Sequence, residues 1–271
     1  MLSESNEKRK TTDIRMPDGN IVRIEAHSSL SSTAELAKKY AGEGYGDRYV
    51  VFTENQSSSK IIGTKLSEND SEYGVFVSCI LRPSLFASQA GFLTPLATVA
   101  LLTALDEYSA KPLESGWLSG IYCEGKKIGG VCIEGKLDSY KAYEYIIISF
   151  AIKLDDTNFP PRMSDIIRRI FEDENISIPF IIAKSILKSF FEIYSELKNP
   201  TKHIDIYSKR SALIGQTVKY IENEKRRRCR VLGVDENCSL IVECRDKSVK
   251  YISNVKNVII PKKLKKKKAE K

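Results

Sequence analysis

Histidine is almost absent from this chain: only His27 and His203 occur among its 271 residues. Neither histidine lies in a cluster with the spacing of zinc ligands, so no metal site is expected from them. The same scarcity argues against hydrolases built on a Ser-His-Asp or Cys-His arrangement. The six cysteines include no Cys-x-x-Cys pair, and several lie within apolar alternation, where cysteine acts as a small hydrophobe. This usage favours reduced thiols and a cytoplasmic protein.

Long hydrophobic runs are also lacking. The longest mainly apolar stretch, residues 91–105, is interrupted by threonine and proline and is too short to span a bilayer. The N-terminus is polar and charged, unlike a secretory signal. A soluble protein with no membrane partner is therefore expected. Its 271 residues suffice for one substantial core and a small second domain.

Acidic residues are outnumbered, and the formal net charge is +8. The excess is concentrated in residues 225–230 and 262–271. Such basic runs are usually solvated faces or tails, and sometimes a patch for nucleic acid or a membrane surface. The sequence thus leaves open a weak, unspecific binding of polyanions through these segments.

Hydrophobic periodicity predicts an α+β protein. Strands are expected at 21–25, 49–56, 74–82 and 143–154, and helices at 33–41, 89–109, 164–172 and 179–197. Ser32 followed by Glu35 is a capping-box signature for the first helix. Short strands fill the C-terminal part. The expected organisation is a disordered lead-in (1–19), a main domain (20–198), a linker (199–212), a small β domain (213–261) and a basic tail (262–271).

Residues 116–134 predict a hairpin with its turn at Glu124-Gly125-Lys126-Lys127. Gly129 and Gly130 in its second strand are unusual, because glycine weakens a strand and often marks a bulge or the close approach of a ligand or another backbone. A lysine three residues before Gly130 can point an ammonium at that place. Judged by sequence mechanics alone, solvated turn lysines and a simple glycine bulge are the favoured interpretation.

This hairpin resembles the central hairpin of the biotin–protein ligases, where a Lys-Trp-Pro-Asn-Asp-Leu strand precedes a Lys-x-x-Gly-Ile-x-x-Glu strand. Four positions match the family: Trp117, Lys127, Gly130 and Glu134. In the first strand Gly116 stands where the family has lysine, and Gly120 where it has aspartate.

The resemblance extends over about residues 20–261. Ser32-Thr33-Ala34 stands in place of a biotin-contacting Ser-Thr-Asn triplet, and Gln56 matches a glutamine before the family's arginine-rich loop. In that loop Lys60 keeps one positive charge, whereas Ile62 replaces an arginine. The resemblance implies a class II synthetase-like mixed sheet with flanking helices and a small C-terminal SH3-like β-barrel. It also implies that Phe150 adds bulk at the floor of the ligand pocket and that Lys153 replaces an asparagine.

The ligase reaction joins biotin to the α-phosphate of ATP and then to a lysine of a carrier domain, so cations must bring two anions together. Most positions that would supply this charge or hold magnesium are lost here. The biotin side is better kept. The resemblance therefore implies Lys127 as the catalytic residue and a ligand site formed by Ser32, Thr33, Gln56, Lys60, Trp117, Lys127 and Gly130.

Three hypotheses follow. The first is a catalytically impaired, ligase-like protein that binds biotin or a carrier domain, as a monomer or homodimer. The second is a divergent active ligase that uses ATP and magnesium, with Lys60, Lys65 and Lys126 as substitute cations. The third is a nucleic-acid-binding module that uses the two basic segments, although it lacks a base-reading motif.

Overall fold

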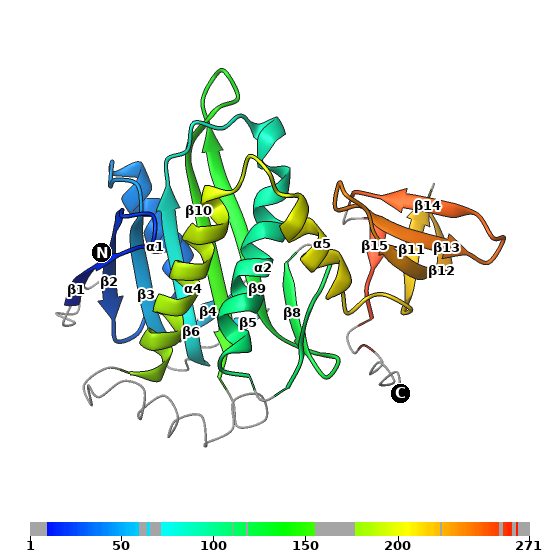
Figure 1. The fold of residues 1–271 in the computed structure, drawn as a ribbon, viewed down its shortest axis with the longest axis horizontal. Helices are drawn as coiled ribbons and strands as arrows, with labels where there is room; N and C mark the ends of the chain where they lie inside the picture. Colours follow the sequence, from blue (N-terminus) through cyan, green and yellow to red (C-terminus); the bar gives the residue numbers. More distant parts are fainter. Residues whose placement is uncertain are drawn as a thin grey trace.

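A large mixed β-sheet with helices on both faces and a smaller C-terminal β-sheet make up the protein (Figure 1). The structure, a computed structural model, describes residues 10–59, 64–65, 72–109, 111–117, 119–154, 177–222, 224–254, 257–261 and 264. Within these residues the expected α+β class is confirmed.

The large sheet has eight strands in the order β1-β2-β3-β6-β10-β9-β8-β7. Strands β2 and β3 run parallel, and the other neighbours pair antiparallel. The strands are β1 (Lys10–Arg15), β2 (Ile21–His27), β3 (Tyr49–Gln56), β6 (Glu72–Leu81), β7 (Leu113–Ser115), β8 (Gly120–Cys123), β9 (Lys126–Leu137) and β10 (Tyr143–Lys153). A separate two-stranded pair joins β4 (Ser58–Ser59) to β5 (Thr64–Lys65).

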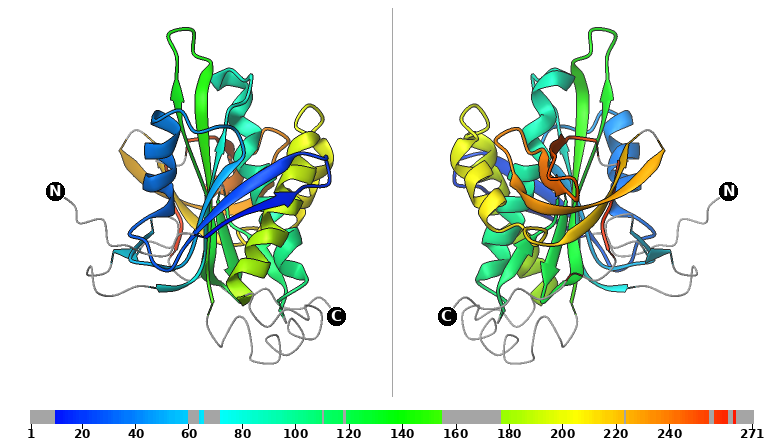
Figure 2. Two further views of the ribbon diagram at one scale, coloured as in Figure 1. Left: turned by 90° about the vertical axis from the view of Figure 1, so that its left-hand side faces the viewer. Right: turned by 90° about the vertical axis from the view of Figure 1, so that its right-hand side faces the viewer.

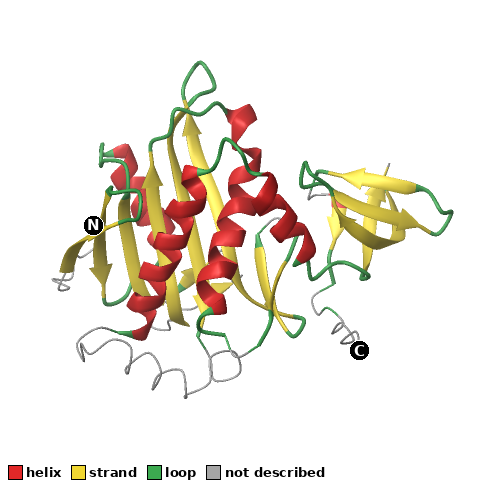
Figure 3. Ribbon diagram, in the orientation of Figure 1, coloured by secondary structure: helices red, strands yellow, loops and turns green. Residues whose placement is uncertain are grey.

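Helix α1 (Thr33–Gly42) covers one face of this sheet, and α2 (Leu93–Asp106) and α4 (Ile178–Ser195) cover the other (Figures 2 and 3). A 3₁₀ turn, η1 (Ala87–Phe92), leads into α2, and α5 (Thr201–Lys209) packs against α2. Because successive side chains of a strand point to opposite faces of the sheet, a central strand contributes residues to the core on the α1 side and to the core under α2 and α4. In β3, for example, Val51 belongs to the α1-side core and Val50 to the larger core under α2 and α4.

The expected helix at 33–41 and the central hairpin are confirmed. Two expected boundaries are wrong. Residues 10–15, placed in a disordered lead-in, form β1, because their backbone pairs along the edge of β2. The expected linker 199–212 contains α5, whose buried residues include Ile204 and Tyr207. The expected helix at 164–172 lies outside the described residues.

The C-terminal sheet is antiparallel, with its strands in the order β14-β13-β12-β11-β15. They are β11 (Thr217–Glu222), β12 (Lys225–Val234), β13 (Leu240–Cys244), β14 (Val249–Ile252) and β15 (Val258–Ile259). Among the described residues β14 and β15 do not pair with each other, so these strands form an open sheet rather than the closed barrel expected.

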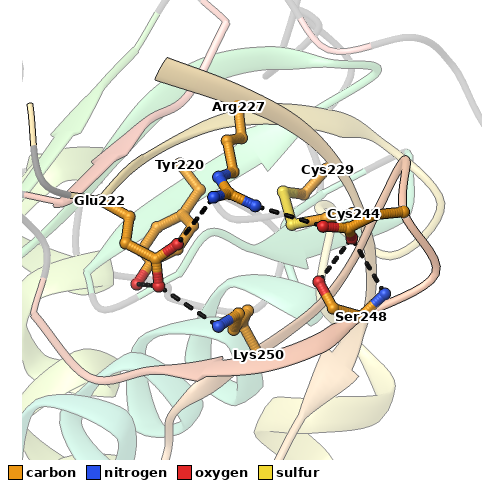
Figure 4. Close-up of a disulfide and its surroundings, with 8 residues drawn as sticks. Tyr220, Glu222, Arg227, Cys229, Cys244, Ser248 and Lys250 are labelled. Carbon is orange, nitrogen blue, oxygen red and sulfur yellow. Dashed lines mark hydrogen bonds and ion pairs between the residues drawn. A yellow bond between two sulfur atoms is a disulfide. The ribbon is translucent and has the colours of Figure 1, made fainter. Parts of the chain in front are cut away.

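Cys229 and Cys244 are joined by a disulfide between neighbouring strands of this sheet (Figure 4). This bond corrects the expectation that the cysteines are reduced thiols. The spacing of the two cysteines along the chain did not indicate that they pair. The two residues are partners in the β12–β13 ladder, with Cα atoms 4.1 Å apart. In the described part of the chain, no helix combines the length and apolar character needed to cross a membrane.

Candidate functional site

A small cavity lies between the start of α1 and the sheet face beneath it. Its volume is about 70 Å³. Three of the expected ligand-site residues line it: Ser32, Thr33 and Gln56. The other lining residues come from α1, from the short segment that follows β3, and from strands β6, β9 and β10. They are Ala34, Glu35, Ser58, Ser59, Phe76, Cys132, Glu134, Ser149, Phe150 and Ala151. The resemblance therefore selected residues that are 24 positions apart in sequence and adjacent in space.

The hydroxyls at the start of α1 are already engaged. Ser32 is the N-cap, and its Oγ accepts a hydrogen bond of 3.3 Å from the backbone N–H of Glu35, as the capping box predicts. The hydroxyl of Thr33 accepts a hydrogen bond of 2.9 Å from Ser78 Oγ, which lies 2.9 Å from Ser149 Oγ. These buried hydroxyls form a polar seam beneath the cavity.

A β-bulge aims Gln56 into this site. The β3–β6 register shifts between Thr53 and Asn55, so the alternation of side chains is displaced by one residue beyond it. The Gln56 side-chain carbonyl then accepts a hydrogen bond of 2.8 Å from the Thr33 N–H, and its amide donates one of 2.7 Å to the Ser58 carbonyl. Gln56 therefore ties α1 and the segment after β3 to the end of the strand.

The cavity is narrow for a ligand site. Small-molecule pockets commonly enclose about 300–1,000 Å³, whereas 70 Å³ corresponds to roughly two water molecules. Phe150 is among the residues that line the cavity but, contrary to the expectation, its ring does not fill the pocket floor. Phe150 packs edge-to-face on Phe190 of α4, with ring centroids 5.6 Å apart, on the opposite side of the sheet. The aromatic residue on the cavity side is Phe76, which is 1% exposed.

Lys153, expected to replace an asparagine of the family, forms an ion pair of 2.5 Å with the buried carboxylate of Glu72. Since Glu72 pairs with Gln56 in the β3–β6 ladder, this ion pair lies at the same end of the sheet as the cavity. The charge of Lys153 is thus used in an ion pair with a buried acid of the sheet.

Lys127 lies on β9 outside the cavity lining. Ile128 and Val131 belong to the core under α2, so alternation directs Lys127 to the opposite face, which also carries Cys132 and Glu134. The residue as a whole is exposed, yet desolvation by its surroundings lowers the pKa of its ammonium. A lowered pKa means that the Lys127 ammonium releases its proton more readily than the ammonium of a fully solvated lysine.

The two hairpin glycines admit another backbone. A Cβ on Gly130 would lie 2.0 Å from the Ser119 carbonyl oxygen, and the residue has φ +156°. A Cβ on Gly129 would lie 2.1 Å from the Ala151 carbonyl oxygen of β10. The close approach predicted at Gly130 is therefore confirmed, and the group that makes it is the backbone of Ser119, just before β8.

Tyr122 occupies the space beside Gly116 and Gly120, the two positions where the ligases carry charged residues. A Cβ on Gly116 would lie 2.6 Å from the Tyr122 ring, and one on Gly120 would lie 2.9 Å from it. The ring is buried, and this burial raises the pKa of its hydroxyl. A side chain at either glycine would require the Tyr122 ring to move. The charged residues of the family are therefore missing at these two positions, and the tyrosine ring also occupies the space that their side chains would need.

Trp117 does not contribute to the cavity. Its indole is 4% exposed, and Nε1 donates a hydrogen bond of 3.0 Å to the Cys238 carbonyl in the C-terminal sheet. It connects the two sheets. Lys60, the remaining expected site residue, lies outside the described residues, as does Ile62; Lys65 is described only as part of β5.

Ser78 and Ser149 were not predicted as site residues. The available signal was a serine within each otherwise apolar strand, in Val75–Leu81 and in Ile146–Ile152. No cluster of histidine, cysteine, aspartate or glutamate suited to a metal ion occurs in the part of the chain that the structure describes.

Comparison with known proteins gives a consistent family. Bifunctional ligase/repressor BirA of Bacillus subtilis is 26% identical over 141 residues, which cover 52% of this chain and 43% of BirA. The corresponding protein of Bacillus spizizenii is 24% identical over 138 residues. This chain therefore aligns with less than half the length of these curated relatives. No family model matches the sequence.

Solved structures of the same family share the fold. Biotin protein ligase from Aquifex aeolicus in complex with biotin and ATP superposes with a TM-score of 0.62 at 16% identity, over 87% of this chain and 97% of that one. A biotin protein ligase-like protein of unknown function from Silicibacter gives 0.58 at 14% identity, over 89% and 96%. The resemblance seen in the sequence is thus confirmed: the chain is related to the biotin protein ligases and has their fold.

Proposed function

We propose that this relative of the biotin protein ligases binds biotin, or a carboxylic acid of that class, weakly and does not convert it to an adenylate. The observation that carries the proposal is an asymmetry between two neighbouring regions. Ser32, Thr33 and Gln56 converge on one cavity, whereas Tyr122 fills the space beside Gly116 and Gly120.

Weak binding follows from the size of the cavity. A volume of about 70 Å³ must increase before an acid of several heavy atoms can enter. If the open form is a minor population, the apparent affinity falls in proportion to that population. The hydrogen bonds of Gln56 with Thr33 and Ser58 oppose opening, since a ligand would have to replace them.

Loss of adenylation follows from charge. Joining a carboxylate to a phosphate requires cations placed in advance, and each such electrostatic contact typically contributes about 3–4 kcal/mol to transition-state stabilisation. Neither Gly116 nor Gly120 can supply a charged side chain. On the described part of the hairpin, Lys127 is the residue to which the resemblance assigns the catalytic role, and it lies outside the cavity lining.

Calorimetric titration of biotin, first alone and then with ATP and magnesium, tests the proposal together with mass spectrometry for biotinyl-adenylate. Biotin binding that is unchanged by ATP, without adenylate, is expected. Adenylate formation at any turnover would overturn the proposal. Absence of biotin binding up to millimolar concentration would remove the ligand assignment and leave only the fold in common with the ligases.

The alternative is a divergent, active ligase that adenylates biotin and transfers it to a carrier-domain lysine. One observation favours it: a Cβ on Gly120 would lie 3.7 Å from Lys127 Cε, so this lysine reaches the position of the missing aspartate. ATP-dependent labelling of a biotin carrier domain distinguishes the two proposals. A carrier domain is also the macromolecular partner we propose, and an SH3-like module is the proposed class of the C-terminal sheet.

A further inference from the structure

The outer face of the C-terminal sheet carries an uncompensated row of positive charge. Alternation along β12 turns Cys229 and Val231 into the core and places Arg226, Arg228 and Arg230 on the exposed side. The β11–β12 ladder sets Lys219 opposite Arg228. Arg245 follows Cys244, the ladder partner of Cys229, and therefore lies beside Arg228. We call Lys219, Arg226, Arg228, Arg230 and Arg245 the arginine face.

On the inner side of the same strand, in contrast, the arginine is paired with acidic residues. Arg227 lies 3.5 Å from a Glu222 oxygen and 3.2 Å from an Asp246 oxygen, so its charge is neutralised (Figure 4). Lys250 shares Glu222, at 3.2 Å. Within the described part of the chain, none of the five members of the arginine face forms an ion pair. The contrast between alternate arginines of one strand argues that the outer row is not simply balancing nearby acids.

Acidic side chains are scarce on the outer face. Within its paired strands Glu243 is the acid, opposite Arg230, and its carboxylate lies 3.7 Å from Lys247. At one end of the row a shallow hollow of about 490 Å³ is lined by Arg226, Arg227, Arg228, Cys244, Arg245 and Asp246. Five cations therefore face Glu243 on the paired strands, and Asp246 at the end of the row is paired with Arg227, so the field of this surface attracts a polyanion.

Exposed apolar side chains lie beside the charges. Tyr251 of β14 is 67% exposed, and Val249 is 46% exposed. The ladders place Tyr251 opposite Ile241 and Val249 opposite Glu243, on the same outer face as Arg230. Two strand spacings, roughly 10 Å, separate β14 from β12. A flat surface therefore presents an aromatic ring at one side and a row of guanidinium groups at the other.

We propose that this outer face binds single-stranded nucleic acid, with phosphates on the arginine face and a base stacked on Tyr251. Proteins that bind single strands without sequence preference combine a basic track with aromatic side chains in this way. A duplex would satisfy the arginines but could not stack a paired base on the tyrosine. The binding is independent of the cavity at α1 and goes beyond the function proposed for it.

Fluorescence anisotropy of the full chain with a labelled single-stranded oligonucleotide of about 20 nucleotides tests the proposal, since binding sites of this kind cover roughly 4–16 nucleotides. The variant Arg226→Gln/Arg228→Gln/Arg230→Gln is expected to weaken binding at least tenfold. The slope of log affinity against log salt should fall by about 2, as three phosphate contacts on a single strand predict. Tyr251→Ala should weaken binding roughly tenfold with little change of slope.

A matched control removes three charges elsewhere, by Lys39→Gln/Lys126→Gln/Lys202→Gln, all at exposed positions of the large domain. It should leave affinity within about twofold. Truncation after Leu264 separates the arginine face from the basic tail and should preserve the effect of the triple arginine variant. Circular dichroism and thermal melting confirm that each variant is folded.

Three results would overturn the proposal. Equal losses in the two triple variants would indicate a response to net charge alone. Equal affinity for a duplex of the same length, with no effect of Tyr251→Ala, would indicate unspecific attraction to any phosphate backbone. Binding to phosphatidylserine vesicles or to polyglutamate that displaces the oligonucleotide at comparable charge concentration would assign the face to a different partner.

Discussion

The backbone N–H of Thr33 donates a hydrogen bond of 2.8 Å to the side-chain carbonyl of Gln56, which joins the first turn of α1 to the end of β3. Both residues are buried. The contact uses an N–H that the start of a helix leaves without a partner inside the helix. It also places the glutamine in the cavity wall, so one bond serves the fold and shapes the candidate site.

Replacing Gln56 by alanine should therefore destabilise the protein. The buried Thr33 N–H would lose its acceptor, at a cost of about 1–3 kcal/mol in the free energy of unfolding. Urea denaturation of the variant and the parent measures this difference in the free energy of unfolding. Asn55→Ala is the matched control, because the Asn55 side chain makes one exposed hydrogen bond to the Ser28 carbonyl. Equal stability of the two variants would show that the Thr33 contact contributes little.

Gly130→Ala should destabilise by about 3 kcal/mol or more, since the added Cβ meets the Ser119 carbonyl oxygen at 2.0 Å and the residue has a left-handed φ. Gly233→Ala, another strand glycine, is the control, because its Cβ would have nothing within 4 Å. Thermal unfolding compares them. A Gly130→Ala protein as stable as the parent would mean that the backbone of the hairpin readily moves away.

Lys127→Ala should weaken biotin binding roughly tenfold, as loss of a charge-assisted contact to a carboxylate. Lys126→Ala, a change at the adjacent exposed position, should not. Desolvation lowers the pKa of the Lys127 ammonium below 10.5, so its positive charge is lost as the pH rises through the lowered value. Affinity should accordingly decline on the alkaline side at a pH below 10.5, with no such decline in the alanine variant. An identical alkaline profile in the two proteins would exclude Lys127 as the group responsible.

Reduction of the Cys229–Cys244 disulfide should lower stability. The bridge closes a sequence separation of 15 residues, for which chain entropy predicts about 3 kcal/mol. The melting temperature of the parent should fall with a thiol reductant, whereas that of Cys229→Ala/Cys244→Ala should be low and unaffected. A parent that is insensitive to the reductant would show that the two thiols are not bonded in solution.

A buried acid should make the protein sensitive to low pH. Burial raises the pKa of Glu25, but hydrogen bonds from Tyr49, Tyr40 and His27 lower it by more, so the net pKa lies below 4.5. Its stabilising contribution is complete above pH 4.5 and is lost as the pH falls through the lowered value. Glu25→Gln should cost about 1–3 kcal/mol at pH 7 and progressively less in acid.

Exposed Glu43, 3.9 Å from Lys39, provides the control for this acid effect. Glu43→Gln should change stability by less than about 1 kcal/mol, because an exposed ion pair contributes little. If the free energy of unfolding of Glu25→Gln and of the parent changed in parallel between pH 3 and pH 7, Glu25 would not be the group responsible for the loss of stability in acid.

The sequence alone determined the secondary structure of most of the chain and named three of the residues that line the cavity. Period-2 and helical patterns are local, and so are the capping signal at Ser32 and the turn at Gly125; each depends on neighbours a few residues away. The resemblance to the ligases grouped Ser32, Thr33 and Gln56, and the structure places these three residues around one cavity.

Tertiary structure decided what local patterns cannot encode. The direction of Phe150 depends on which face of β10 meets α4, and the burial of Trp117 depends on how the C-terminal sheet docks. The Cys229–Cys244 bond depends on a ladder register, and the need for glycine at 130 depends on a carbonyl from Ser119. Each of these outcomes depends on contacts between segments far apart in the sequence, so local patterns could name the residues but not the partners that they meet.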